Sequence, residues 1–489
     1  MVNKLVTNKS AVSAKYGANQ NLFWAQVDRL MAYDRKRGVI TELVCVDDAQ
    51  QMLSIDTPVV TSESNYQQNK VAIDGIFNGY NPHFITILGA DDIIPFQQLK
   101  NPQDASFIPS DLPYACMKGY SDDIKQFIAP NRMVTRLPDV KGNVTPETLV
   151  AFVKTVDAVI SSFPDTADQY KSWWNVCTTQ RKVAMDCTEN YFQSRGVRFD
   201  KYISPSDGPD WRMAVYGKRV HHHIVHGSQY ENVLYGESFP PTTYPNAVEA
   251  LKVKDKVKTG TVVLEIACYG AQLYDPANGK SGTHGLPIAN MYLSSGAVGM
   301  IGSTISTYSS LSGMACSDYM ASYFMEAVLD KKTFAEALLL ARQRLLMRYT
   351  TLDAIAQITL AEFLVYGYPS SNVVKTDRGD EILEEPNRDM HRSTAEQLGQ
   401  SIRYAVHRPE LRPSAQSEQY IRDFLAQKGV DDMIPLKGYA IEGGSPSLAR
   451  DPIIHQYLAT VARGRFDFSL YLFTESDGRI IEKKEYAQN

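Results

Sequence analysis

The sequence lacks the features of a membrane, exported or nucleic-acid-binding protein. Its longest apolar runs, such as FITILG and TVVLEIA, fall well short of the about 20 residues that a transmembrane helix needs. The N-terminus, MVNKLVTNKSAVSAKYG, has no apolar core of signal-peptide length. The net charge is only −5 over 489 residues, and no basic cluster stands out. We therefore expect a cytoplasmic protein with no membrane and no nucleic-acid partner.

Cysteine is also scarce. The six cysteines are spread along the chain, and no two of them form a CxxC pair. This density is too low for a disulfide scaffold, and the spacing argues against a structural zinc site of the CxxC type. The pattern favours free thiols in a reducing compartment, where one of them can serve as a nucleophile.

What the sequence does contain is an alternation of helical and strand segments. The strand segments are apolar throughout, which is typical of a parallel sheet covered by helices on both faces. The alternation runs through residues 1–140, restarts, and continues through 141–375. Residues 376–415 are charged and proline-bearing, and one helix and three strands follow them. We predict two α/β halves, 1–140 and 141–375, and a small α+β module at 376–489.

Two reactive side chains follow neighbouring strands of the second half. Cys268 comes directly after the apolar run VVLEIA, and His226 closes the strand RVHHHIV. The spacing leaves room for one crossover connection with its helix, so both can lie at the same edge of the sheet. An imidazole beside a thiol can generate the thiolate nucleophile. The N–H groups of Gly227 and Cys268 could then stabilise an oxyanion. Taken singly, each side chain is more often a packed core residue.

Several motifs together resemble the gingipain family of cysteine endopeptidases, within the caspase-like clan. They occur in the family's order between about residues 80 and 375: FITILGADDIIPF, SDLPYACM, NRMVTRLPDV, HGS, IACYG, GAVGMIGSTISTY and FLVYGYPSSNVV. In the last motif Tyr368 replaces the family's aspartate. The resemblance implies a caspase-like or gingipain-like, mostly parallel α/β fold that binds protein or peptide substrates and needs no cofactor.

The resemblance also assigns roles. Cys268 corresponds to the nucleophile, His226 to the general base and acid, and Gly227 to the oxyanion-hole position. Cleavage after basic residues is the family's default, and Asp186 is the best candidate for a carboxylate that binds such a side chain. Glu265, three residues before the cysteine, is interpreted as structural. The carboxylate that orients the histidine cannot be placed from the sequence.

Two alternatives stay open. The first is a catalytically inactive caspase-like scaffold, and in either case a regulatory protein or ligand could bind through the C-terminal module. The second is a metal site in the run HHHIVH, where His222 and His226 share one strand face and His221 and His223 the other. No HExxH or CxxC motif supports it, so we expect no metal.

Overall fold

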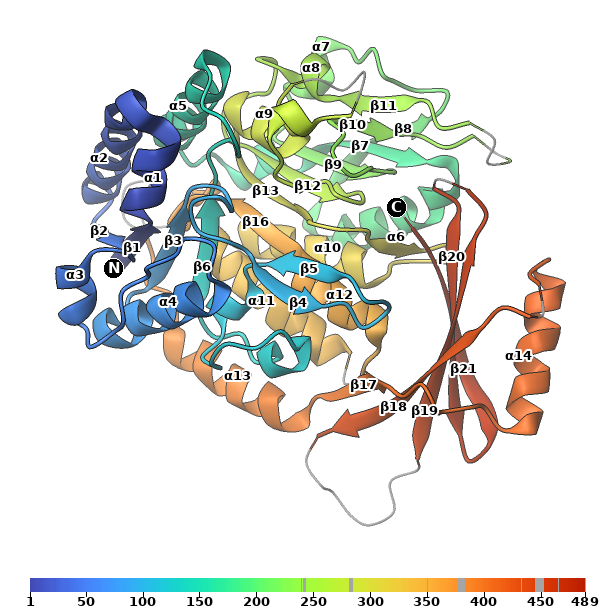
Figure 1. Ribbon diagram of the computed structural model, residues 1–489. Helices are drawn as coiled ribbons and strands as arrows, with labels where there is room; N and C mark the ends of the chain where they lie inside the picture. The colour runs from blue at the N-terminus through green and yellow to red at the C-terminus, as the bar shows by residue number, and fades with distance from the viewer. Residues whose placement is uncertain are drawn as a thin grey trace.

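A computed structural model describes residues 1–238, 240, 243–280, 285–349, 351–375, 383–431, 433–444, 453–464 and 466–488. The described residues build a central ten-stranded sheet (Figure 1). Its strand order is β2 (Ile40–Cys45), β1 (Val2–Thr7), β3 (Phe84–Leu88), β6 (Met133–Leu137), β16 (Phe363–Gly367), β13 (Ala297–Ser303), β12 (Thr261–Ile266), β9 (Val220–Ile224), β7 (Ser172–Thr178) and β8 (Arg198–Ser204).

Two parallel groups of strands meet at β16. The first four strands in the order pair in parallel, and so do the last five. Strand β16 runs antiparallel to β13 and parallel to β6, and thereby joins the two groups into one sheet. The predicted mostly parallel α/β sheet is confirmed.

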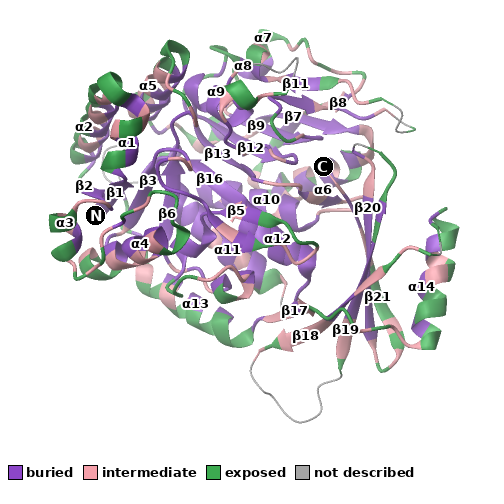
Figure 2. Cartoon of the chain, viewed as in Figure 1, coloured by how far each residue is buried: buried purple, intermediate pink, exposed green. Residues whose placement is uncertain are grey.

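Helices cover both faces, which explains why the strands carry continuous apolar runs. Figure 1 shows α2, α5 and α9 on one face and α4, α10 and α11 on the other. Alternate residues of β12 enter different cores: Val263 packs in the α9 layer, whereas Val262 and Leu264 pack in the α10–α11 layer. Figure 2 shows the central strands buried throughout. The helices are α1 (Lys9–Tyr16), α2 (Gln20–Lys36), α3 (Ala49–Leu53), α4 (Tyr66–Tyr80), α5 (Pro146–Ser161), α6 (Lys182–Phe192), α7 (Met213–Tyr216), α8 (Ala250–Val253), α9 (Ile288–Ser294), α10 (Cys316–Leu329), α11 (Phe334–Arg348), α12 (Ala354–Glu362), α13 (Arg388–Ser401) and α14 (Ala415–Gln427).

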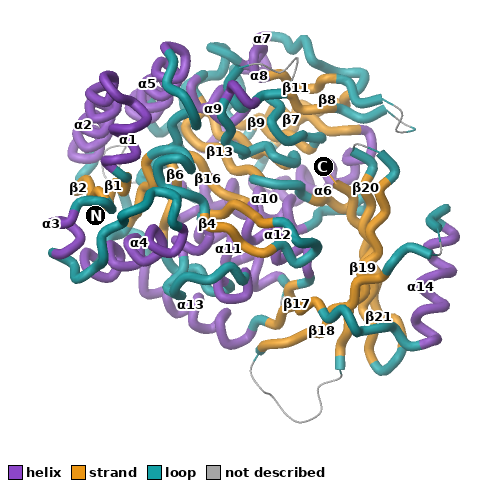
Figure 3. Tube along the Cα trace, in the orientation of Figure 1, coloured by secondary structure: helices purple, strands orange, loops and turns teal. Residues whose placement is uncertain are grey.

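A second, curled sheet contains the C-terminal strands β17 to β21 (Figure 3). Its order is β14 (Tyr308–Ser310), β21 (Arg479–Gln488), β20 (Phe468–Ser476), β19 (Ile454–Ala462), β18 (Leu436–Gly443), β17 (Arg403–His407) and β15 (Thr351–Leu352). Both edge strands, β14 and β15, come from before residue 376, so this sheet is attached to the second half at its two ends. The predicted domain boundaries at 140 and 375 stay predictions.

Local sequence explains several element ends. Thr145 caps α5 by accepting a hydrogen bond from the Thr148 N–H, with proline at the first helical position, where its missing N–H costs nothing. Asp477 and Gly478 both have positive φ, as expected for the tight turn that joins β20 and β21.

Other elements were missed from the sequence. The polar, proline-bearing segment 98–117 shows no strand pattern in the sequence, but it contains most of a hairpin, β4 (Gln97–Lys100) and β5 (Phe107–Ser110). Helix α13 and strands β17 and β19 were also missed, as was the small pair β10 (Val233–Tyr235) and β11 (Asn246–Glu249). Among the described residues, no helix combines the length and apolar character needed to cross a membrane.

Candidate active site

His226 and Cys268 follow the ends of adjacent strands. Strands β9 and β12 pair in parallel with Ile224 opposite Ile266, so each reactive residue lies two positions beyond that last pair. His226 leaves the sheet direction by pairing its main chain with Tyr235, through N–H···O bonds of 2.9 and 2.8 Å. The structure therefore brings the two segments to the same edge of the sheet, as the sequence predicted.

Gly227 lies directly against the main chain of Cys268. A Cβ at position 227 would come within 1.8 Å of the Cys268 carbonyl oxygen, a separation that no side chain tolerates. Only glycine permits this approach, which places the peptide units of Gly227 and Cys268 side by side.

The Cys268 thiol is fully buried. Its Sγ accepts a hydrogen bond from the Thr307 N–H at 3.2 Å and lies 3.5 Å from the Thr307 carbonyl oxygen. Burial raises the pKa of this thiol to about 12, and hydrogen bonds from the Thr307 backbone and from the side chains of Gln488 and Ser306 offset part of that rise. A buried thiol with this pKa is almost entirely protonated at neutral pH, so the structure shows the site in an unreactive arrangement.

The His226 imidazole is only 1% exposed and lies against a carboxylate and two aromatic rings. Its Nε2 is 3.4 Å from Oε2 of Glu237, which is also buried. The Gln180 amide donates to the other Glu237 oxygen at 3.2 Å. Tyr244 meets the imidazole edge-on, with ring centroids 5.5 Å apart, and Phe466 stacks on it at 5.1 Å.

Glu237 is the functional candidate that sequence reasoning missed. It follows β10, a three-residue strand, in a segment without a motif. The bridge between His226 and Tyr235 and the 3.0 Å hydrogen bond from the Glu237 N–H to the Ser204 carbonyl place it beside the imidazole. Gln180 donates a hydrogen bond to Glu237, but nothing in the sequence around Gln180 indicates this contact.

Asp186 forms ion pairs with two neighbouring lysines. Its carboxylate pairs with Lys182 at 2.6 Å and with Lys201 at 2.7 Å. Its role in substrate binding stays a prediction. The charged side chain that the structure places near the thiol is instead Arg181, which is fully buried and whose pKa burial lowers. Its nearby charged and titratable groups include Glu237, Asp318 and Cys268.

The remaining histidines of the run serve the core. His222 contacts Asn175 and Trp173 on one face of β9, and His221 and His223 contact Trp174 and Tyr292 on the other, which confirms the predicted alternation for these three. His226 lies beyond the end of β9 and does not share a strand face with His222. Glu265 holds His223 through a 2.8 Å contact to Nδ1, in line with the structural role assigned to it. Burial lowers the pKa of His223 to about 3 and raises that of Glu265 well above its usual value. Within the described residues, no group of three or more His, Cys, Asp or Glu side chains could hold a metal ion.

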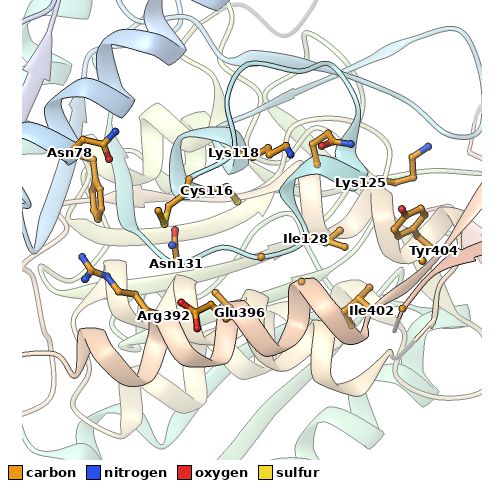
Figure 4. A pocket seen from close by; sticks show the side chains of 18 of the residues that line it. Asn78, Cys116, Lys118, Lys125, Ile128, Asn131, Arg392, Glu396, Ile402 and Tyr404 are labelled. Atoms are coloured by element: carbon orange, nitrogen blue, oxygen red, sulfur yellow. The ribbon is translucent and has the colours of Figure 1, made fainter. Parts of the chain in front are cut away.

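A surface cavity of about 1010 Å³ lies away from these side chains (Figure 4). It opens between α4, α13 and the loop after β5, and Lys118, Lys125, Arg392 and Glu396 line it. A smaller polar cavity of about 390 Å³ lies closer to the candidate site. It is lined by residues that follow Gly227 and Cys268 in the chain, among them Gln229, Tyr230 and Gln272.

Comparison with known proteins bears on the family and the fold. The model of peptidase family C25 matches residues 155–374. The crystal structure of the arginine-specific cysteine proteinase gingipain R is similar in fold: 13% sequence identity, a TM-score of 0.52, and coverage of 99% of this chain and 96% of that one. No curated protein matches the sequence. The matched segment contains His226, Gly227 and Cys268. Residues 155–374 are therefore a domain of peptidase family C25, the gingipain family of cysteine peptidases.

Proposed function

We propose that this chain is a cysteine endopeptidase that hydrolyses peptide bonds through Cys268 and His226. The observation that carries the proposal is the register of β9 and β12, with Gly227 seated against Cys268. The two reactive groups come from neighbouring segments of one sheet edge, and a glycine allows their main chains to meet there.

The reaction follows from the residue types. His226 takes the thiol proton, and the thiolate attacks the carbonyl carbon of the substrate to form a carbon–sulfur bond. The resulting oxyanion is held by the N–H groups of Gly227 and Cys268. As the carbon–nitrogen bond breaks, His226 gives its proton to the departing amine. Water then attacks the acyl-enzyme with His226 as base, and the thiol is restored.

Glu237 serves as a positioning residue for His226. Because its carboxylate lies 3.4 Å from Nε2, it favours the tautomer with the proton on that nitrogen. Nδ1 is then the nitrogen that can accept the thiol proton. The same carboxylate stabilises the imidazolium that forms during attack, and Gln180 fixes the carboxylate in turn.

The alternative is an inactive scaffold with the same fold. The burial and raised pKa of the Cys268 thiol favour it, because a protonated, enclosed sulfur cannot attack a peptide. Family membership implies protein or peptide substrates, and cleavage after basic residues stays a prediction. A regulatory protein or ligand acting on the C-terminal sheet would reconcile an enclosed site with an active enzyme.

A peptide-library assay separates these functions. It uses the wild type and a variant in which the two side chains that cover the site are shortened, Phe466→Ala/Gln488→Ala, each with and without Cys268→Ala. We expect cleavage that disappears with Cys268→Ala, and the sequences of the products give the specificity. Cleavage that survives Cys268→Ala would reject the assignment. Absence of cleavage in a chain whose Cys268 reacts with iodoacetamide would favour the scaffold.

A further inference from the structure

The curled C-terminal sheet reaches the candidate active site through β14. This strand directly follows the segment 303–307, whose Thr307 N–H binds the Cys268 sulfur. Strand β21 pairs with β14 antiparallel, with Tyr308 opposite Gln488, Ser309 opposite Ala487 and Ser310 opposite Tyr486. Figure 1 shows this end of β21 beside α6, next to the second half of the central sheet. The last described residues of the chain therefore lie at the thiol.

Gln488 contacts the surroundings of Cys268 with both its main chain and its side chain. Its carbonyl oxygen accepts a 2.6 Å hydrogen bond from Nη2 of the buried Arg181. Its side-chain amide donates to Oγ of Ser306 at 3.0 Å, and it also hydrogen-bonds to the thiol. These contacts join residues about 180 to 310 positions apart in the sequence, so they depend on the folded C-terminal sheet.

Phe466 covers the other reactive side chain. It lies between β19 and β20, far from β21 in sequence, and is 4% exposed. Its ring stacks on the His226 imidazole with an interplanar angle of 22° and also contacts Tyr235 and Tyr244, at 5.4 and 4.9 Å. An aromatic ring stacked on the imidazole fills the space that a substrate needs beside the base.

Two separate segments of one sheet thus enclose the two reactive groups. Cys268 is 0% exposed and His226 1% exposed. We propose that Phe466 and residues 486–488 form an autoinhibitory cover, which must move away from β14 before a polypeptide can reach Cys268. This inference rests on the proposed function of the site. It identifies the C-terminal sheet as the device that keeps the site closed.

Alkylation of Cys268 by iodoacetamide, measured by peptide mass spectrometry, tests the cover. We expect the rate in Phe466→Ala/Gln488→Ala to exceed that of the wild type at least tenfold. Tyr420→Ala, an exposed residue of α14 in the same module, is the matched control and should leave the rate unchanged. The buried Cys177 and Cys316 report on unfolding, since a global loss of structure would raise their rates in parallel. An equal Cys268 rate in the wild type and the variant would overturn the cover.

A disulfide provides the opposite test and does not depend on tolerance of the alanine substitutions. Ser309 and Ala487 are opposite each other in the antiparallel β14–β21 pair, where Cα separations of about 4.5–5.5 Å suit a disulfide. In Ser309→Cys/Ala487→Cys, we expect oxidation to slow Cys268 alkylation and peptide cleavage at least tenfold, and reduction to restore both. The single-cysteine variants, treated identically, are the controls. An oxidised chain that reacts as fast as the reduced one would overturn the cover.

The cover and the proposed function fail in distinguishable ways. If shortening the covering side chains speeds alkylation but no peptide is cleaved, the cover stands and the peptidase proposal falls. If the wild type cleaves peptides as fast as the shortened variant, the peptidase proposal stands and the cover falls.

Discussion

In both halves of the central sheet a buried polar or reactive side chain follows the end of a strand, but the groups that surround these side chains come from different parts of the chain. In the first half, Asp139 follows β6 and is held by groups of the same half: the Ala90 N–H at 2.7 Å, the Tyr16 hydroxyl at 2.6 Å and the Lys15 ammonium at 2.8 Å. In the second half, Cys268 and His226 follow β12 and β9 and are covered by Gln488 and Phe466.

This difference in surroundings distinguishes Asp139, a structural residue, from Cys268 and His226, the proposed reactive residues. A buried carboxylate with three donors from its own half is fully satisfied and has no reason to be uncovered. The thiol and imidazole are enclosed by segments that reach them only through a second sheet. Moving that sheet would expose reactive groups without disturbing the strands that carry them. Substitutions at the two kinds of strand end test this contrast.

Removing the sulfur should abolish activity without affecting the fold. In the chain with shortened covering side chains, Cys268→Ala should lower peptide cleavage by about 10⁴-fold or more, because it removes the sulfur that forms the acyl-enzyme. Cleavage rates and thermal unfolding are measured together. A loss of activity with an equal loss of folded protein would mean that Cys268 is a core residue like Asp139.

Removing Asp139, the corresponding side chain of the first half, should lower stability and leave the reactivity of Cys268 unchanged. Asp139→Ala removes one of the two carboxylates that pair with the buried Lys15, the other being Asp92, and leaves the Ala90 N–H and the Tyr16 hydroxyl without their acceptor. The loss should cost about 3 kcal/mol in the free energy of unfolding. Denaturant unfolding measures this cost. The molecules that remain folded should alkylate Cys268 at the wild-type rate. A changed alkylation rate at unchanged stability would show that the two strand ends are coupled.

Glu237→Gln should lower kcat by about 10²-fold in the chain with shortened covering side chains and leave KM nearly unchanged. The amide retains the size of the side chain but cannot stabilise the imidazolium of His226. Glu237→Asp should recover part of the rate, and the acidic limb of the pH profile should shift in Glu237→Gln.

Glu249→Gln is the matched control for Glu237, since its carboxylate binds Asn246 and Lys252 and has no contact with His226 among those described. An unchanged pH profile in Glu237→Gln would reduce Glu237 to a packing residue.

The last prediction concerns Glu362, whose carboxylate accepts a 2.8 Å hydrogen bond from Ser303 behind Cys268. Burial raises its pKa to about 8, above the unfolded value near 4.3. Folded protein therefore retains a proton that unfolded protein releases, and stability should fall as pH rises from about 4 to 8, by at most about 1.4 kcal/mol per pH unit. Glu362→Gln should flatten this slope in denaturant titrations. A slope identical to that of the wild type would contradict the shifted pKa.

The sequence predicted what depends on local pattern. Apolar runs identified β9 and β12, and the register of these parallel strands places the segments that carry His226 and Cys268 at one edge of the sheet. The three strands expected after residue 415 are present, and β18 (Leu436–Gly443) is one of them. Each of these signals depends only on residues that are close together in the sequence.

The sequence did not reveal what depends on long-range contact. Glu237 carries no motif, and its role arises only because His226 bridges to Tyr235. The hydrogen bond between Arg181 and Gln488 joins the segment before α6 to the end of β21 in the C-terminal sheet. No periodicity encodes such a pair, so the C-terminal module was interpreted as an appendage.

The central claim is that His226 activates Cys268, and the pH dependence of Cys268 alkylation tests it most directly. The measurement compares Phe466→Ala/Gln488→Ala with the same chain carrying His226→Ala, over pH 5 to 10. We predict that the chain with histidine reacts through a thiol that ionises below the free cysteine value of about 8.5, and that His226→Ala slows the reaction at pH 7 at least tenfold. Identical profiles with and without the imidazole would contradict the account.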